Sequence, residues 1–448
     1  MLNIQNNSNK QTFFEKVKSM LIGLFANKLK RDFIWNVGVL GISGILVILS
    51  NTIVTRIRGF GGLGLYSQAL APYIMISQIA VWGIHFSVLR GVSYNQDNPK
   101  KSSEIYSSGL ILVFFTSLII GSVFFMSRFL IADFFDSEGV ADAILYISPG
   151  IVFLSMYKVL ANALNATRRM RVYGSFQALR VFSYVIGTMI ILALKLPNTH
   201  LTLAMTFSEI IAFFSIFLYL NFRFHRFILN KKVLKMIPEH LVFGSKGFLS
   251  GFLFNVNLRI DIIMIGFVYS DAITGIYYYA TQIIEGANEI TYIMRKNADP
   301  VIGKLFSENK TEEIGVFLRE IKKKFYPFMF VFGIIAIAGF PLLGIIKSSS
   351  ADFVLSDFIE SWKVFIILML GIMIVAGYRP SFWILVQAGY PGTFTKVMLV
   401  AVGFNIVFNA LLISFIGIYG AAIATALNYA LQAFLVVYLS RRMLNIKL

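Results

Sequence analysis

The sequence predicts an all-α membrane protein with twelve transmembrane helices, and three observations support this fold class. Of the 448 residues, 57% are hydrophobic and 14% are charged, and the mean hydropathy is +0.74. Twelve runs of about 20 residues carry few or no charges, a length that crosses a hydrocarbon core of roughly 30 Å. These runs are continuously apolar, whereas strands of a membrane β-barrel alternate polar and apolar residues.

Six of the predicted spans lie in the first half of the chain. The first and third contain no ionisable side chain, and the second contains only His85. The fourth, fifth and sixth contain one charged residue each, at Lys158, Arg180 and Glu209. These spans are 33–53, 69–89, 109–127, 143–165, 172–194 and 201–220.

The other six predicted spans lie in the second half of the chain. The ninth and twelfth spans lack ionisable residues, and the eleventh has Lys396 at its cytoplasmic edge. The tenth has Lys363 and Arg379 toward its two ends, from which we expect both to snorkel to the membrane surfaces. These spans are 247–269, 273–294, 326–346, 361–385, 395–415 and 419–440.

The positive charge of the chain predicts its orientation. Thirty of the 40 Lys and Arg residues fall in the loops and tails of one side, five on the other side and five within spans. Because positive residues are retained in the cytoplasm, we expect both termini to be cytoplasmic. The basic residues are divided among separate loops, which argues against a nucleic-acid surface despite the net charge of +18.

The spans divide into two lobes of six helices. Residues 33–220 form the predicted N-terminal lobe and 247–440 the C-terminal lobe, joined by a cytoplasmic linker, 221–246. A basic amphipathic segment, 1–32, precedes them, and a cytoplasmic tail, 441–448, follows them.

An internal repeat supports the two lobes. "GLYSQA" begins at Gly64 and "GIYYYA" at Gly275, so Gly-x-Tyr-x-x-Ala occurs at equivalent places in the second and eighth spans. "YGSF" at 173–176 and "PGTF" at 391–394 open the fifth and eleventh spans in the same way. Six-plus-six repeats are typical of transporters whose substrate binds between the halves, although the small residues themselves suit close helix packing.

Several chemistries are not supported. The chain has no cysteine, and its four histidines lack metal-ligand or catalytic spacing, so we expect no metal, no cofactor and no enzymatic activity. The sequence "GFGGLG" at 59–64 matches a dinucleotide fingerprint, but no strand precedes it and no acidic residue follows about 20 positions later.

Three segments together resemble a known family: "GLYSQA", "IAVWGIHFSVLRGVSYN" at 79–95, and "FNIVFNALLISFIGIYGAAIATALNYALQAFLVVYL" at 404–439. They are similar to the bacterial O-antigen and capsule repeat-unit flippases of the multidrug, oligosaccharidyl-lipid and polysaccharide exporter superfamily. The resemblance implies a V-shaped, MATE-like pair of lobes in the bacterial inner membrane. It also implies that an undecaprenyl-pyrophosphate-linked glycan is moved from the inner to the outer leaflet. The implied partners are membrane lipids and the polymerase and chain-length machinery of that pathway.

The candidate substrate-binding residues are the cations and one amide inside the spans. Arg259 lies near the middle of the seventh span, and a guanidinium suits a pyrophosphate because it offers a planar fork of donors. Lys158 and Arg180 could hold the same anion at other depths, and Asn255 could bind sugar hydroxyls. The alternative is that these charges only neutralise acids on adjacent helices, Arg259 with Glu285 and Arg180 with Glu209.

The candidate ion-coupling or counter-ion residues are the intramembrane acids Glu285, Glu289, Asp261 and Glu209. Glu285 and Glu289 share one helix face because they are four residues apart. A rival function is a MATE-type multidrug exporter, which would bind lipophilic cations and use acids of the N-terminal lobe. In that lobe only Glu209 is an intramembrane acid, which favours an anionic substrate.

Overall fold

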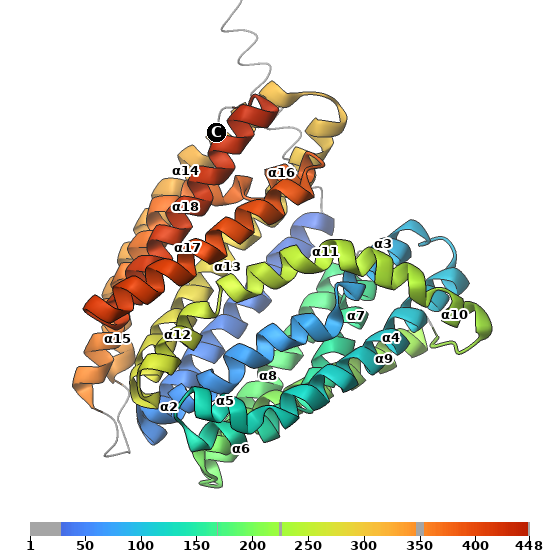
Figure 1. The fold of residues 1–448 in the computed structure, drawn as a ribbon. Coiled ribbons are helices and arrows are strands. Elements are labelled where there is room, and N and C mark those ends of the chain that lie inside the picture. Colours follow the sequence, from blue (N-terminus) through green and yellow to red (C-terminus); the bar gives the residue numbers. More distant parts are fainter. Residues whose placement is uncertain (1–27, 168, 224–225, 346–353, 447–448) are drawn as a thin grey trace, which may run out of the picture.

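A computed structural model describes residues 28–167, 169–223, 226–345 and 354–446. Every regular element in these ranges is helical, which confirms the all-α prediction. The helices form two bundles that converge at one end and diverge toward the other (Figure 1). The amphipathic segment expected at 1–32 lies almost wholly outside the described residues.

The first bundle begins with α2 (Lys28–Val81), whose 54 residues would measure about 80 Å if straight. Gly59, with φ 67°, interrupts it, so α2 contains the first span and most of the second. Trp82 and Gly83 have positive φ and separate α2 from α3. The remaining elements are α3 (Ile84–Tyr94), α4 (Pro99–Met126), α5 (Arg128–Phe134), α6 (Glu138–Ile147), α7 (Gly150–Ala166), α8 (Met170–Ala193), η1 (Asn198–His200) and α9 (Leu201–Arg223).

The second bundle also contains broken spans. The seventh is divided between α11 and α12, which meet at a bend of 44°, and the tenth between α15, η3 and α16. The elements are α10 (Lys231–Lys235), α11 (Ile237–Asn257), α12 (Ile260–Val268), α13 (Asp271–Ser307), α14 (Thr311–Gly339), η2 (Phe340–Ile345), α15 (Leu355–Val375), η3 (Ala376–Ser381), α16 (Ile384–Gln387), α17 (Pro391–Ile416) and α18 (Ile418–Leu444).

The helices account for the predicted spans. Within the described ranges, eight helices are long and apolar enough to cross a membrane, or up to ten when each bent pair is one span. In addition, α2 covers the first predicted span and, with α3, the second, and α13 covers the eighth, which carries two glutamates. All twelve predicted spans therefore coincide with helical segments.

The two repeated motifs contact each other. A Cβ on Gly64 would lie 1.7 Å from the carbonyl oxygen of Asp271, and one on Gly275 would lie 1.9 Å from that of Phe60. Each ideal Cβ would also lie 2.9 Å from the backbone nitrogen of the other glycine. Glycine thus allows α2 and α13 to pack backbone to backbone at the convergent end of the lobes.

A second contact between the halves involves α11. His240 shares hydrogen bonds with Ser87 of α3 (2.9 Å) and Ser108 of α4 (2.7 Å). Trp82 donates to the Ser245 hydroxyl at 2.9 Å, and its ring stacks on Phe248 at 4.5 Å. Although α11 begins the second half of the chain, its first turns therefore pack on the first bundle (Figure 1).

Candidate functional site between the lobes

Arg259 lies at the break in the seventh span. It precedes α12 with φ −129° and ψ −10°, a conformation outside the helical region. Its Nη1 is 2.6 Å from Oε1 of Glu285 on α13, and the side chains are 11% and 38% exposed, respectively. An arginine at the N-terminus of a helix adds its charge to the positive end of the helix dipole. The break therefore places a guanidinium beside a helix N-terminus at mid-span, where the acids Glu285 and Asp261 act on it electrostatically.

Asp261, in the first turn of α12, is buried and its carboxylate is well supplied with donors. Tyr277 donates a hydrogen bond to Oδ2 at 2.7 Å, and Thr425 contacts the same oxygen at 3.4 Å. The backbone nitrogen of Ile262 donates to Oδ1 at 2.9 Å. Tyr277 is the tyrosine of the second repeat, so this motif also supplies a polar contact that its small residues did not predict.

Amides of α17 and α18 meet the end of α11 beside the break. Asn428 donates to the side-chain oxygen of Asn257 at 2.7 Å, and Asn405 approaches the backbone oxygen of Asn257 at 3.4 Å. The amide of Asn409 donates to Asn405 at 2.9 Å. Asn255, the amide predicted to meet sugar, instead donates to the Gly251 carbonyl of its own helix at 2.8 Å.

In the first bundle, Arg180 of α8 is engaged by Glu209 of α9. Its Nε donates to the two carboxylate oxygens at 2.8 and 3.0 Å, and Nη2 approaches Oε1 at 2.5 Å. Glu209 is fully buried, whereas Arg180 is 25% exposed. Lys158 of α7 lies close to this pair and donates to the Ser77 hydroxyl of α2 at 3.0 Å. These contacts assemble one cationic cluster on this lobe.

Both ion pairs considered in the sequence, Arg259 with Glu285 and Arg180 with Glu209, are present. They differ in geometry. Glu209 is saturated by a fork of donors, while Glu285 contacts Arg259 through one nitrogen and keeps more than a third of its surface exposed. Glu289, one turn further along α13, is exposed. The roles of these residues in binding or coupling stay predictions.

A layer of tyrosines lies between the Arg259 pair and the convergent end. The ring of Tyr66, the tyrosine of the first repeat, is 6.1 Å from Tyr278 of α13 and 6.2 Å from Tyr184 of α8. Next to it, Thr52 and Tyr279 share a hydrogen bond of 2.6 Å between α2 and α13. Together with the glycine contact, this layer joins α2, α8 and α13 where the two bundles converge.

The expectation that Arg379 snorkels to a membrane surface is wrong. Arg379 is only 7% exposed, and its guanidinium lies 4.7 Å from the ring centre of Tyr429. The cause is the 3₁₀ element η3, where Arg379 precedes Pro380. A residue before proline avoids the α-helical region, so "RP" within an apolar run was the available signal for this break.

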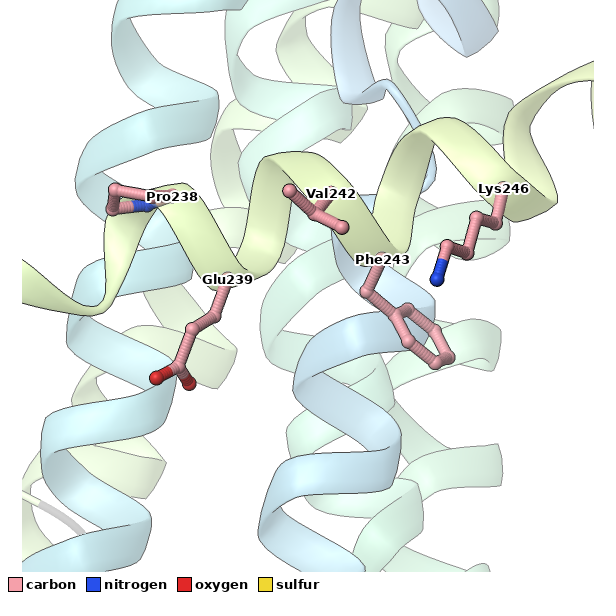
Figure 2. Close-up of a pocket in the computed structure, with 5 residues that line it drawn as sticks. All are labelled: Pro238, Glu239, Val242, Phe243 and Lys246. Atoms are coloured by element: carbon pink, nitrogen blue, oxygen red, sulfur yellow. The ribbon is translucent and has the colours of Figure 1, made fainter.

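A surface cavity of about 390 Å³ lies elsewhere, on α11 (Figure 2). Pro238, Glu239, Val242, Phe243 and Lys246 line it, all from this one helix. None of the predicted site residues borders it. Across the described part of the chain, no three His, Asp or Glu side chains are grouped so that they could hold a metal ion.

The comparison with protein families identifies the chain. Residues 29–306 match the family model described as "Polysaccharide biosynthesis protein". The chain belongs to this family. No curated protein matches its sequence.

Solved structures show which fold this family member has. The lipid II flippase MurJ, in an inward closed conformation, aligns with a TM-score of 0.73 at 16% identity, covering 90% of this chain and 87% of that one. A multidrug resistance MATE family transporter of the MOP superfamily, in an inward-facing conformation, aligns with a TM-score of 0.75 at 13% identity, covering 92% and 98%. A MOP superfamily transporter from Pyrococcus furiosus aligns with a TM-score of 0.60 at 13% identity, covering 93% and 96%.

The predicted resemblance to the exporter superfamily is therefore confirmed at the levels of family and fold. The chain is a multi-pass membrane protein of a polysaccharide-biosynthesis family with the architecture of flippases and MATE-type transporters.

Proposed function

We propose that the chain is a flippase that moves an undecaprenyl-pyrophosphate-linked oligosaccharide from the inner to the outer leaflet of the bacterial inner membrane. The observation that supports this most is Arg259 at the broken centre of the seventh span. Discontinuous membrane helices direct their half-helix N-termini toward anionic parts of transported substrates. Arg259 adds a fork of donors at such a terminus, which matches a pyrophosphate better than a cation.

The opposite lobe supports an anionic substrate as well. Its cluster contains Lys158 and Arg180 against one acid, Glu209, whose oxygens already accept from Arg180. A net positive wall attracts a pyrophosphate and repels a lipophilic cation. In this proposal Arg259 contacts the pyrophosphate, and Arg180 and Lys158 strengthen the positive electrostatic potential that attracts it. Asn255 binds the glycan after breaking its hydrogen bond to Gly251.

The contacts between the lobes support alternating access. With the N- and C-termini cytoplasmic, the glycine contact and the tyrosine layer lie at the outer end, where they close the site to the outside. Separation of α2 from α13 would then open it. Glu285, Glu289, Asp261 and Glu209 act in this cycle as counter-ions or as carriers of the coupling ion. Asp261 and Glu209 have the more complete sets of donors, which suits counter-ions.

The second candidate is a cation-coupled MATE-type multidrug exporter. Its support is the exposure of Glu285 and Glu289 on one face of α13, since carboxylates in that position could receive a lipophilic cation. The two functions differ in the sign of the substrate charge, so they predict opposite effects of removing Arg259.

The test uses a strain that lacks the chain and is complemented with the original protein, Arg259→Lys or Arg259→Gln. We expect lipid-linked glycans to accumulate on the cytoplasmic face of sealed spheroplasts without the chain, together with loss of surface polysaccharide. Arg259→Gln should fail to restore export at a normal protein level, and Arg259→Lys should restore it in part. Unchanged lipids with new sensitivity to cationic dyes would favour the drug exporter.

The complemented deletion strain also tests whether the chain acts before the polymerase of a surface polysaccharide. The polymerase and chain-length proteins of the same polysaccharide are the proposed downstream partners, because they act on glycans that have reached the outer leaflet. Restoration of full-length surface polymer by the complemented strain is the expected outcome.

A further inference from the structure

A second group of cations lies inside the C-terminal lobe, away from Arg259. Arg295 of α13 and Arg379 of η3 are 9% and 7% exposed. The Nε and Nη1 atoms of Arg295 and the Nε and Nη2 atoms of Arg379 are buried without a hydrogen-bond acceptor. A buried guanidinium whose N–H groups have no acceptor is costly, because each group has lost its water.

The two arginines form one cluster. The guanidinium of Arg295 lies 4.5 Å from the ring centre of Trp383 and 5.3 Å from that of Tyr292. Tyr292 is within electrostatic reach of both Arg295 and Arg379, and the two arginines repel each other. Because rings cover the faces of these guanidiniums, their donors are left at the edges, in the plane of each group.

Another donor of the cluster lacks an acceptor too. The indole nitrogen of Trp383, whose ring lies against Arg295, is buried without a hydrogen-bond partner. The nearest acid, Asp299, is 3.9 Å from Nε of Arg295, which is an ion pair but too long for a hydrogen bond. Lys296 and the acids Glu289 and Glu285 also act electrostatically here, and Glu285 is itself paired with Arg259. The buried donors of the cluster that lack a partner therefore outnumber its buried acceptors that lack one, of which Oδ1 of Asp299 is one.

The backbone at this place is irregular. The tenth span changes from α15 to the 3₁₀ element η3 and then to the short α16, so Arg379 and Trp383 lie at a break in a membrane helix. Irregular backbone at membrane depth is tolerated where it is buried in protein or lines a polar site. By the predicted topology, the break lies toward the cytoplasmic side.

We propose that Arg295 and Arg379 form a binding site for a phosphate group presented from the cytoplasmic side. A phosphate has several acceptor oxygens and can satisfy the edges of two guanidiniums at once, which a single carboxylate does less well. The phosphate can belong to an inner-leaflet lipid or to a soluble phosphoester. The site is distinct from the Arg259 site and does not depend on the proposed flipping activity.

Binding is measured on the purified full chain in nanodiscs of phosphatidylcholine. One arm adds inorganic pyrophosphate, and the other replaces part of the lipid with phosphatidic acid. We expect a saturable rise in thermal stability in at least one arm; a response to pyrophosphate alone assigns a soluble ligand, and a response to phosphatidic acid alone a lipid headgroup. Arg379→Met should weaken the response at least about tenfold. The exposed Arg441→Gln is the matched control and should respond like the original chain.

A second measurement does not depend on how the variant folds. Hydrogen exchange of the unmodified chain should slow at residues 376–388 when the effective probe is present. The proposal is overturned if neither probe stabilises the chain or protects these residues, or if Arg379→Met folds and responds as the original chain does.

Discussion

Arg180 and Arg259 show how the same residue type can be held in two ways inside a membrane bundle. Arg180 is bound by both oxygens of a fully buried carboxylate, so its charge is largely neutralised within the first lobe. Arg259 contacts Glu285 through one nitrogen, and Glu285 keeps 38% of its side chain exposed. Arg259 can therefore exchange Glu285 for a substrate anion at a lower cost in free energy than Arg180 can exchange Glu209. For this reason we assign the central role to Arg259.

The Arg180 pair gives a prediction about stability. Glu209→Ala leaves a mostly buried guanidinium without its counter-ion, and we expect a loss of about 3 kcal/mol in the free energy of unfolding. The measurement is thermal unfolding in detergent, with the exposed Glu312→Ala as control. The double change Arg180→Met with Glu209→Leu should recover much of the loss. Equal stability of Glu209→Ala and Glu312→Ala would mean that the pair contributes nothing.

At the scale of elements, the fold depends on two places where helices of different halves meet. The first is the contact of α2 with α13 at Gly64 and Gly275, where no side chain fits between the backbones. The second is the docking of α11 on α3 and α4 through His240. Each contact joins segments far apart in the sequence and must change if the lobes move relative to each other.

The glycine contact is tested by adding one carbon. Gly64→Ala places a Cβ 1.7 Å from a backbone oxygen, so α2 and α13 must move apart. We expect a loss of about 1 to 3 kcal/mol, the usual cost of overpacking. Gly61→Ala, three residues away, meets nothing within 4 Å and should be neutral or slightly stabilising. Identical melting temperatures for the two variants would refute the close contact.

The docking of α11 should depend on pH. His240 lies before the predicted span, and burial lowers the pKa of its imidazole below the ordinary 6.5, although nearby Glu239 acts in the opposite direction. Well above pH 6.5 the ring is neutral whether docked or free, so the docking energy does not change there. Below pH 6.5 the free ring binds a proton that the docked ring resists, so docking weakens as the pH falls.

Hydrogen exchange of α11 provides the measurement. Exchange at residues 237–246, corrected for the intrinsic effect of pH, should become faster between pH 7 and pH 5. His240→Gln should remove most of this dependence, because glutamine cannot take up a proton in this range. The same pH dependence in the variant would assign it to another group.

On the scale of the whole molecule, the sequence predicted most of the architecture. Apolar run length and charge distribution report the depth of a residue, so the twelve spans and the mid-depth position of Arg259 could be predicted. The sequence carries weaker signals for the direction in which a side chain faces around its helix axis and for the places where a helix breaks. The break before Arg259 has no proline or glycine directly beside it, and the burial of Arg379 depends on Tyr429 of another helix. The repeat predicted two lobes, but only the structure shows its glycines in contact.

Transport of a lipid-linked pyrophosphate oligosaccharide by the purified chain in proteoliposomes is the most direct test of the account. Because the chain has no cysteine, Ser137→Cys with Asp271→Cys provides a locked control. These side chains already meet at 3.1 Å between the lobes, and a cross-link there should stop transport until it is reduced.

In that assay we expect the glycan to appear in the opposite leaflet with the original chain and at least about tenfold more slowly with Arg259→Gln. Transport at the original rate by Arg259→Gln, or none by the original chain together with export of lipophilic cations, would contradict the account.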